Sequence, residues 1–251
     1  ALRDANKYVR SSAVEALGRI GPDAKDAIPA LIDALQDDWA YARRSAVEAL
    51  GKIGADAKDA VPALIDALQD DWAYARRSAA EALGEIGAAK PSTLAALSEA
   101  LSDLNPLVRA SAAKALGQFG TESKAFSDSL IQIATDENVA VRAHVIFTLS
   151  KIGLDAKQLV PLLAVALADT DMSVRKPAVE ALVDIGPQAV EAVTPLAAVL
   201  SDPDVGIKKN FFASFHRFRF LQFVVRIAIS KSRGCDHRGS CRSADKKVAP
   251  R

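Results

Sequence analysis

A period of 33 residues is the feature of this sequence that most limits the folds open to it. Residues 22–54 and 55–87 differ at only four of their 33 positions. The frame continues more weakly along the chain as an aspartate, a basic residue six positions later and a glycine. The aspartates are Asp4, Asp37, Asp70, Asp103, Asp136, Asp169 and Asp202; the basic residues are Arg10, Arg43, Arg76, Arg109, Arg142, Arg175 and Lys208; and the glycines are Gly21, Gly54, Gly87, Gly120, Gly153 and Gly186. Such a period indicates a tandem-repeat protein whose units pack only on their neighbours.

Each unit is predicted to hold two helices. In residues 24–36 apolar side chains recur at helical spacing, and in residues 39–53 they do so again, ending at a glycine suited to a helix C-terminus. The apolar positions are Ile28, Leu31, Ile32 and Leu35 in the first helix and Ala42, Ala46, Leu50 and Ile53 in the second. Because neither helix buries its apolar face alone, the units are expected to share one continuous core.

Three further residue types predict details of these helices. A proline recurs inside the first helix, where it should remove a backbone hydrogen bond and bend the helix. An aspartate stands where it can cap the second helix, and a mid-helix glycine should let a neighbouring helix come close. The prolines are Pro29, Pro62 and Pro161, the capping aspartates are Asp38 and Asp71, and the glycines are Gly18, Gly51, Gly84 and Gly117.

The composition agrees with helices and excludes several classes of protein. Aromatic residues make up only 6% of the chain, which favours closely packed helices over a β-sandwich. Two cysteines near the C-terminus cannot support a disulfide scaffold. No uncharged apolar run reaches the length of a membrane span, and the N-terminus has no signal-peptide pattern, so an intracellular location is expected, cytoplasmic or, in an alga, in the plastid stroma.

The second helix carries the pattern D-x-x-x-x-V/A-R-x-x-A-x-x-A-L-G-x-I-G, and the helix before it carries A-x-P-x-L. This pattern resembles the HEAT repeat and, more narrowly, the short HEAT-like units of phycobilin lyases. The resemblance covers residues 4 to about 210. It implies an all-α fold, a right-handed α-solenoid of about six to seven helix pairs. HEAT arrays serve as scaffolds, adaptors, chaperone-like lyases and a few enzymes, so the resemblance specifies the fold more closely than the function.

The resemblance also implies a structural role for the recurring aspartates and basic residues. In HEAT proteins these side chains bond from one unit to the next, so we expect a structural ladder rather than an anion-binding stripe. Residues 1–7 supply no first helix before Tyr8, so the chain is expected to be either a fragment or one end of a longer array.

The second helices of HEAT arrays line the concave face, where solenoids usually bind partners. Aromatic and arginine residues are enriched in binding hot spots, and they gather here at positions that the repeat frame does not require. The predicted partner-binding residues are Trp39, Tyr41, Arg44, Trp72, Tyr74, Arg77, Lys114, His144 and Phe147, with Leu107, Lys176 and Glu180 on the same face. The alternative is that the tryptophans only cover the edges between repeats or are simply a result of the duplication.

The sequence carries no catalytic constellation, no phosphate-binding loop and no dinucleotide fingerprint. We therefore predict a non-enzymatic scaffold that binds another protein and needs no cofactor or metal. The alternative, implied by the resemblance, is a subunit of a phycobilin lyase or isomerase. In that case rim arginines and aromatic residues would hold the propionates and pyrrole rings of a bilin.

The C-terminal part differs from the repeats. Residues 1–206 carry a net charge of −9, whereas residues 207–251 carry +10. Residues 207–229 are predicted to be a basic, Phe-rich amphipathic helix that caps the stack, with a binding element or altered-frame sequence as alternatives. Residues 230–251 form a polar basic tail that can touch nucleic acid or an anionic membrane. Cys235, His237 and Cys241 fall short of the four ligands of a closed zinc site.

Overall fold

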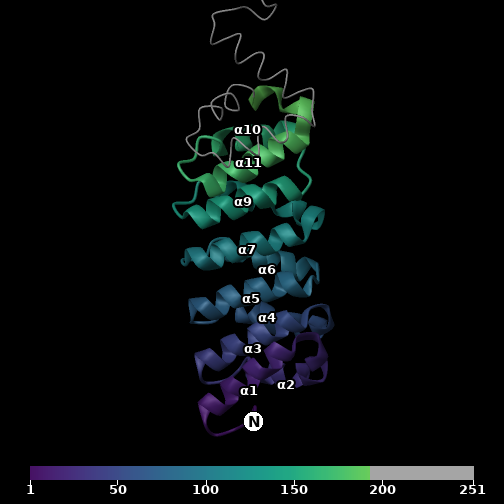
Figure 1. Ribbon diagram of the computed structural model, residues 1–251, viewed down its shortest axis with the longest axis vertical. Helices are drawn as coiled ribbons and strands as arrows, with labels where there is room; N and C mark the ends of the chain where they lie inside the picture. The colour runs from purple at the N-terminus through teal and green to yellow at the C-terminus, as the bar shows by residue number, and fades with distance from the viewer. Residues whose placement is uncertain (193–251) are drawn as a thin grey trace, which may run out of the picture. The chain divides into compact units, whose positions relative to one another are not determined.

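The computed structural model describes residues 1–192, which are helical with no strand among them (Figure 1). These residues fall into two compact units that divide at Asp155 and Ala156. None of the helices described is long and apolar enough to cross a bilayer. The predictions for residues 207–229 and 230–251, including the cap helix and the basic tail, lie outside this described part.

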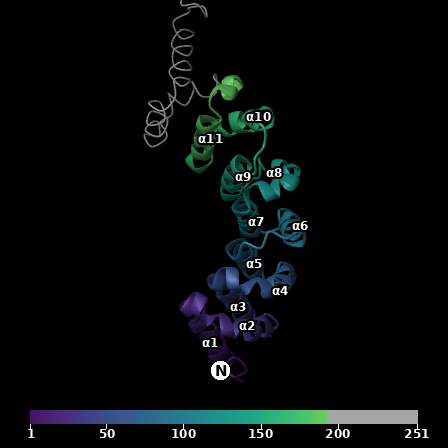
Figure 2. The ribbon, with the colours of Figure 1, turned by 90° about the vertical axis from the view of Figure 1, so that its right-hand side faces the viewer.

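The first unit is a stack of helices in two layers, which Figure 2 shows from the side. One layer, the odd-helix layer, contains α1 (Lys7–Ile20), α3 (Ala40–Ile53), α5 (Ala73–Ile86), α7 (Pro106–Gln118) and α9 (Val139–Lys151). The other contains α2 (Ile28–Ala34), α4 (Val61–Ala67), α6 (Pro91–Ala100) and α8 (Ser127–Gln132). Successive odd helices from α1 to α9 pack on one another, and α3, α5, α7 and α9 also pack on the even helix that precedes each in the chain. The predicted α-solenoid is therefore confirmed.

The core of this unit lies between the two layers and passes from one repeat to the next. Leu31 and Leu64 of the even helices and Leu50 and Leu83 of the odd helices are fully buried. The apolar positions predicted for the second helix, Ala42, Ala46, Leu50 and Ile53, are at most 2% exposed. Because each odd helix contacts the next, burial in one repeat depends on its neighbour.

The prediction of a bent first helix is wrong for the first two prolines. A 3-10 segment, η1 (Gly21–Ala27) or η2 (Gly54–Ala60), precedes α2 or α4, and the proline stands in the first turn of the α-helix. A proline in the first turn forfeits no helical hydrogen bond, because its N–H would have no intrahelical partner there. Pro29 and Pro62 therefore begin helices rather than bend them. The corresponding segment η3 (Gly120–Phe126) precedes α8.

The glycine predictions are confirmed. Gly54 ends α3 with a φ of 73°, a conformation that strains residues with a Cβ atom. Inside α3, a Cβ atom on Gly51 would lie 3.1 Å from Cα of Ala82 in α5. The odd helices therefore approach each other along a seam of glycine and alanine, which sets a short spacing between successive repeats.

An arginine–aspartate ladder joins the repeats along the odd-helix layer. Nε and Nη2 of Arg43 in α3 donate to the two carboxylate oxygens of Asp70, at 2.6 and 2.9 Å, while Nη1 donates to the backbone oxygen of Asp37 at 3.1 Å. The aspartate is also held by its own repeat, because its Oδ1 accepts the N–H of Trp72 at 2.8 Å. The same bidentate pairs are Arg10–Asp37, Arg76–Asp103 and Arg109–Asp136. The structural role predicted for the recurring aspartates and basic residues is confirmed at these four rungs, whereas Asp202 and Lys208 lie outside the described residues.

The ladder also corrects the predicted helix caps. The residue that immediately precedes α3 is Trp39, and the carboxylate that accepts its N–H belongs to Asp37. Asp38 instead accepts from Nη2 of Arg10 at 2.6 Å, and Asp71 accepts from Nη2 of Arg43 at 2.7 Å. These two carboxylates are therefore additional acceptors for ladder arginines and not helix caps.

The second unit contains α10 (Ala156–Ala166), α11 (Met172–Ile185) and the 3-10 segment η4 (Gly186–Ala192). Here the proline has the predicted interior position, since Pro161 lies inside α10. Asp171 caps α11 by accepting the N–H of Ser173 at 2.8 Å. Leu163 of α10 and Leu182 of α11 are buried in the core of this unit.

Removal of one ladder arginine should destabilise the protein far more than removal of an exposed one. Arg43→Ala leaves a mostly buried carboxylate without its partner, so the free energy of unfolding should fall by about 3 kcal/mol. Arg3 forms an exposed pair with Asp33, and Arg3→Ala should cost less than about 0.5 kcal/mol. Urea unfolding followed by circular dichroism measures both. Equal effects of the two substitutions would contradict a stabilising ladder.

The ladder should also make stability depend on pH in acid. The hydrogen bonds from Arg10 lower the pKa of Asp37 from 3.8 to about 2. A carboxyl group with a depressed folded-state pKa stabilises the fold above its unfolded-state pKa, and this stability is lost as the pH falls from about 4 to about 2. The urea midpoint should drop across this window, and less steeply in Asp37→Asn. The same slope in the variant would show that Asp37 is not responsible.

Candidate functional site

Five aromatic rings form a continuous stripe along the odd-helix layer. The ring centroids of Tyr8 and Trp39 are 5.2 Å apart, those of Trp39 and Tyr41 5.2 Å, those of Tyr41 and Trp72 4.8 Å, and those of Trp72 and Tyr74 5.3 Å. We call this set the aromatic stripe. It contains every tyrosine and every tryptophan of the 251-residue chain. The stripe therefore concentrates on one surface the two side chains most often found at binding hot spots.

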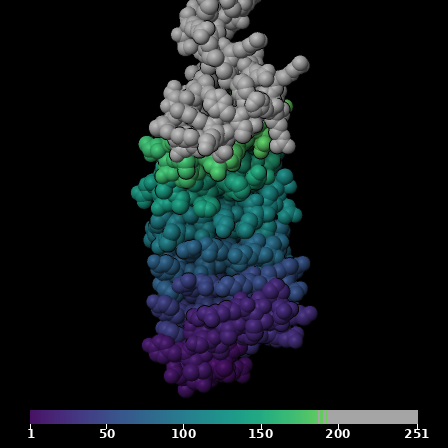
Figure 3. Space-filling view, in the orientation of Figure 1, coloured from purple at the N-terminus to yellow at the C-terminus, as the bar shows by residue number. Residues whose placement is uncertain are grey.

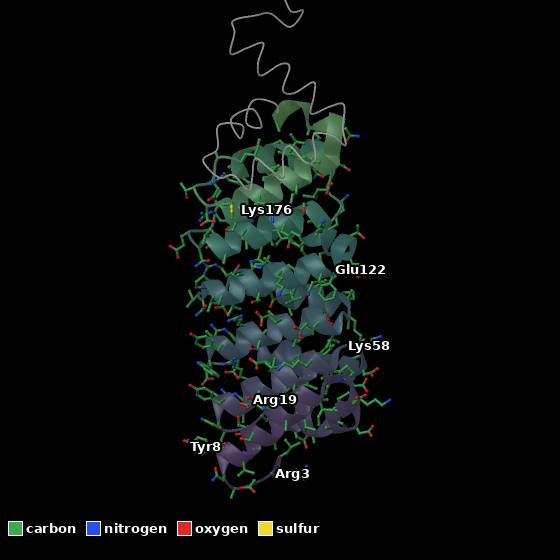
Figure 4. The ribbon with its side chains drawn as sticks, viewed as in Figure 1. Arg3, Tyr8, Arg19, Lys58, Glu122 and Lys176 are labelled. Atoms are coloured by element: carbon green, nitrogen blue, oxygen red, sulfur yellow. The ribbon has the colours of Figure 1, made fainter. Side chains whose placement is uncertain are left out.

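The repeat frame places these rings at the beginnings of the odd helices. Each tyrosine is the second residue of α1, α3 or α5, and each tryptophan immediately precedes α3 or α5. In Figure 4 Tyr8 lies near one edge of the first unit, and Lys58 and Glu122 of the 3-10 segments lie near the opposite edge. In the space-filling view, successive repeats of this unit form adjoining bands of side chains (Figure 3). The stripe thus crosses from one repeat to the next without a break in the ring contacts.

Helix formation does not account for the tryptophans. Helices α1, α7 and α9 follow Asn6, Asn105 and Asn138, whose side chains accept the N–H two residues later. Trp39 has nearly the same backbone angles as Asn6, but its side chain makes no capping hydrogen bond. A tryptophan there forgoes a cap worth about 1 kcal/mol. Its presence at two successive repeats therefore points to a role for the ring itself.

The stripe is open to solvent and is already in contact with cations of the chain. Tyr8, Tyr41 and Tyr74 are 63%, 53% and 46% exposed. Nζ of Lys7 lies 5.2 Å from the ring centroid of Trp39, and the guanidinium carbon of Arg44 lies 6.0 Å from that of Trp72. Both distances are within the range of cation–π attraction, so the ring faces present negative potential to charged groups.

A polar network supports the stripe from the next turn of each helix. Nε of Arg44 donates to Oε1 of Glu48 at 2.7 Å, and the same oxygen accepts from Oγ of Ser78 in α5 at 3.2 Å. One repeat further on, Arg77 donates to Oε1 of Glu81 at 3.1 Å, which accepts from Ser111 of α7. Arg44 is thus held between a carboxylate and the ring of Trp72, which fixes both side chains across two repeats.

The structure brings together most but not all of the predicted site residues. Trp39, Tyr41, Trp72 and Tyr74 are in direct ring contact, Arg44 lies over one of the rings, and Arg77 occupies the equivalent place one repeat later. The remaining predicted residues lie on the later helices of the layer. They are Lys114 on α7 and His144 and Phe147 on α9.

Each of these later residues has contacts of its own, and none with the aromatic stripe or with another of the three is found among the described side chains. Lys114 lies near Glu85, whose pKa is raised by burial and by the neighbouring Glu81, an effect that Lys114 opposes. Nδ1 of His144 lies 2.7 Å from the backbone oxygen of Ala140, so this nitrogen is engaged within its own helix. Phe147 is 44% exposed, and Nζ of Lys151 lies 5.6 Å from its ring centroid.

Sequence reasoning missed two members of the site. Tyr8 begins the stripe, and Lys7 lies over the rings of both Tyr8 and Trp39. A signal was present, because Tyr8 stands 33 residues before Tyr41 and 66 before Tyr74. This spacing is hard to recognise because residues 1–20 contain only the second helix of a repeat, with no first helix before it.

Two hollows in the first unit are lined by ladder residues, whereas a third, of about 170 Å³, lies between α1 and α3 and is lined by Glu15, Glu48 and Lys52 among others. Hollows of about 480 and 430 Å³ open between successive repeats. Asp70 lines both hollows, with Arg76 and Asp103 in one and Arg43 and Asp71 in the other. Within residues 1–192, no group of His, Cys, Asp or Glu side chains has an arrangement that could hold a metal ion.

Comparison of the sequence with known families gives one match. The profile described as HEAT repeats matches residues 1–84, 61–126 and 127–210, which together span most of the chain. No curated protein matches the sequence significantly.

Solved structures with a similar fold include designed and natural repeat proteins. An engineered protein matches with a TM-score of 0.62 and 23% identity over 83% of this chain, which spans only 64% of that protein. A designed armadillo repeat protein in complex with the peptide (KR)4 matches with 0.59 and 18%, covering 76% of this chain and 95% of that one. The complex of CpcE and CpcF of phycocyanin lyase from Nostoc sp. PCC7120 matches with 0.54 and 23%, covering 83% and 90%. At these identities the likeness shows the fold alone.

Replacement of both tryptophans by asparagine should remove the stripe and preserve the fold. In Trp39→Asn/Trp72→Asn, each new side chain can accept the N–H two residues later, as Asn6 accepts that of Tyr8, which offsets the lost ring contacts. The free energy of unfolding should therefore change by less than about 2 kcal/mol. Urea unfolding followed by far-ultraviolet circular dichroism measures it. Leu50→Ala, which empties a buried core position, is the destabilised reference at about 2–5 kcal/mol. If the double variant lost as much free energy of unfolding as Leu50→Ala, the stripe would be a structural element.

Proposed function

The chain belongs to the HEAT-repeat family, and we propose that it is a non-enzymatic interaction scaffold that binds a protein partner through the aromatic stripe. The observation that carries the proposal is the gathering of all tyrosines and tryptophans of the chain on one exposed line across three helices. We place the partner on the odd-helix layer, which the resemblance to HEAT arrays predicts to be the concave one.

The aromatic stripe lowers the stability of the free protein, and a bound partner would offset this loss. Three tyrosines remain about half exposed, and two helices begin without a side-chain cap. Burial of a large aromatic side chain against a partner recovers about 25 cal/mol for each Å² removed from water. Rings already fixed by their neighbours lose little conformational freedom on binding, so more of this gain becomes affinity. Arg44, Arg77, Lys114, His144 and Phe147 are proposed to extend the contact.

The bilin-handling alternative has less support from the side chains described. The arginines proposed to hold propionates, Arg44 and Arg77, are engaged with Glu48 and Glu81 of their own helices. A propionate would have to displace these carboxylates. The hollows between repeats are lined largely by charged and polar groups, whereas sites for large apolar cofactors are mostly apolar. Mixing the protein with a bilin and recording the visible spectrum decides the matter, since a stable shifted absorbance would favour the lyase class.

The basic C-terminal segment gives a separate prediction. Residues 207–251 carry +10, so a contact with nucleic acid or an anionic membrane should weaken steeply with salt. Such a contact should disappear on deletion of residues 220–251, whereas binding through the stripe should persist.

The scaffold proposal is tested by affinity capture from a lysate of the source cells. The baits are the full chain, Trp39→Asn/Trp72→Asn, and Ile20→Ala as a matched control that removes an exposed apolar side chain at the far end of α1 from the stripe. We expect a stoichiometric protein on the full chain and on the control, reduced at least about tenfold on the double variant. Undiminished capture by the double variant would remove the stripe from the partner surface.

A further inference from the structure

The aromatic stripe repeats at a fixed spacing, and this spacing specifies the conformation of what it binds. We infer that its ligand is a proline-rich segment in the polyproline II conformation with a basic residue at every third position. The inference rests on the proposed function and deepens it, because it names the chemistry of the segment that the partner presents.

The spacing follows from the ring contacts. The rings of Trp39 and Trp72 both contact Tyr41, at 5.2 and 4.8 Å, so their centroids are at most about 10 Å apart. Tyr41 and Tyr74 are related in the same way through Trp72, at 4.8 and 5.3 Å. Packed helices lie about 8–10 Å apart, which gives the lower end of the range. The distance between equivalent rings of successive repeats is therefore about 8–10 Å.

Among the regular extended conformations of a peptide, only polyproline II places side chains on one face at an interval of about 8–10 Å. A polyproline II helix rises about 3.1 Å per residue with three residues per turn, so equivalent side chains recur every 9 Å or so. In a β-strand, side chains on one face recur about every 6.7 Å, out of register with the rings. The aromatic lining also matches the chemistry of surfaces that bind proline-rich segments, on which proline rings pack against tyrosine and tryptophan.

The charge beside the stripe favours a basic residue in each turn. Arg10 is shared by the carboxylates of Asp37 and Asp38, and Arg43 by those of Asp70 and Asp71. Each of these rungs thus carries one more negative than positive charge. The second carboxylate of each rung, on Asp38 or Asp71, has a side chain that is 88% exposed and directly precedes a tryptophan of the stripe in sequence. The exposed second carboxylate is therefore present at two successive rungs, directly before Trp39 and Trp72, whereas the equivalent positions one repeat before and after are Ala5 and Leu104.

The rings themselves are suited to a cationic partner. The protein's own Lys7 and Arg44 lie within 6.0 Å of tryptophan ring centroids, as cation–π pairs do. Residues 22–54 and 55–87 differ at four positions, none of which belongs to the stripe or to Asp38 and Asp71, so two successive sites carry the same rings and carboxylates.

The test uses the full chain and two synthetic peptides of equal charge. Arg-Pro-Pro repeated four times places its arginines about 9 Å apart, and Arg-Pro-Pro-Pro repeated four times places them about 12 Å apart. Both tryptophans of the chain belong to the stripe, so intrinsic tryptophan fluorescence reports on this site alone. We expect saturable binding of the first peptide, at least about tenfold tighter than the second. Equal affinities, or no saturable change with either peptide, would overturn the inference.

Two further comparisons separate charge from proline packing. Gln-Pro-Pro repeated four times keeps the conformation and lacks the charge, so it should bind several-fold more weakly. Asp38→Asn/Asp71→Asn should weaken Arg-Pro-Pro binding, whereas Asp56→Asn/Asp59→Asn removes the same charge from exposed positions in η2 and should leave it unchanged. An equal effect of the two double variants would assign the binding to general electrostatics and overturn the inference.

Failure of this inference can be told apart from failure of the proposed function. The variant Trp39→Asn/Trp72→Asn is tested with a fluorescein-labelled peptide, because it has no tryptophan to report. If the peptide fails to bind the full chain while lysate capture still depends on the two tryptophans, the scaffold proposal stands and the polyproline II ligand is wrong. If capture does not depend on them, both fail.

Discussion

The bond between Arg43 of one repeat and Asp70 of the next is the interaction on which the rest of the first unit depends. Its arginine also binds the backbone of its own repeat, and its aspartate also holds the N–H of the tryptophan that precedes the next helix. A single pair therefore fixes the distance between two odd helices and the start of the second one. Together with the close approach at Gly51, it sets the repeat spacing, and that spacing brings Tyr41 within 4.8 Å of Trp72. The ring contacts of the aromatic stripe therefore depend on the ladder.

The two tryptophans show how the fold and the surface make opposite demands on one position. Asparagine occupies this position before α1, α7 and α9 and caps each helix, as helix formation favours. Before α3 and α5 the cap is absent and an aromatic ring stands in its place. The helices still form because the ladder aspartate accepts the tryptophan N–H and the buried face of each helix supplies the main stabilisation. The repeat architecture therefore has enough stability to carry a side chain that contributes little to the helix.

The 33-residue period was enough to predict the helix pairs and the shared core, because both depend on residue spacing alone, whereas the ladder was implied by the resemblance to HEAT repeats. Finer features depend on differences that spacing does not resolve. Periodicity over seven residues cannot distinguish a 3-10 segment from an α-helix, so the sequence predicts one helix with Pro29 in its interior. In the structure α2 begins at Ile28, and Pro29 stands in its first turn. Asp37 and Asp38 are adjacent, and only the backbone geometry decides which one accepts the N–H of Trp39. The ring contact between Tyr41 and Trp72 joins different helices through side-chain orientations, which no sequence pattern specifies.

The most direct test of the account is a fluorine nuclear magnetic resonance titration of the full chain labelled with 5-fluorotryptophan. The chain has two tryptophans, so the spectrum contains one signal from each of two successive repeats. When the captured partner is added, the account predicts that both signals shift together and reach a limit at one partner per chain. If the partner binds and neither signal moves, the aromatic stripe is not the recognition surface of this protein.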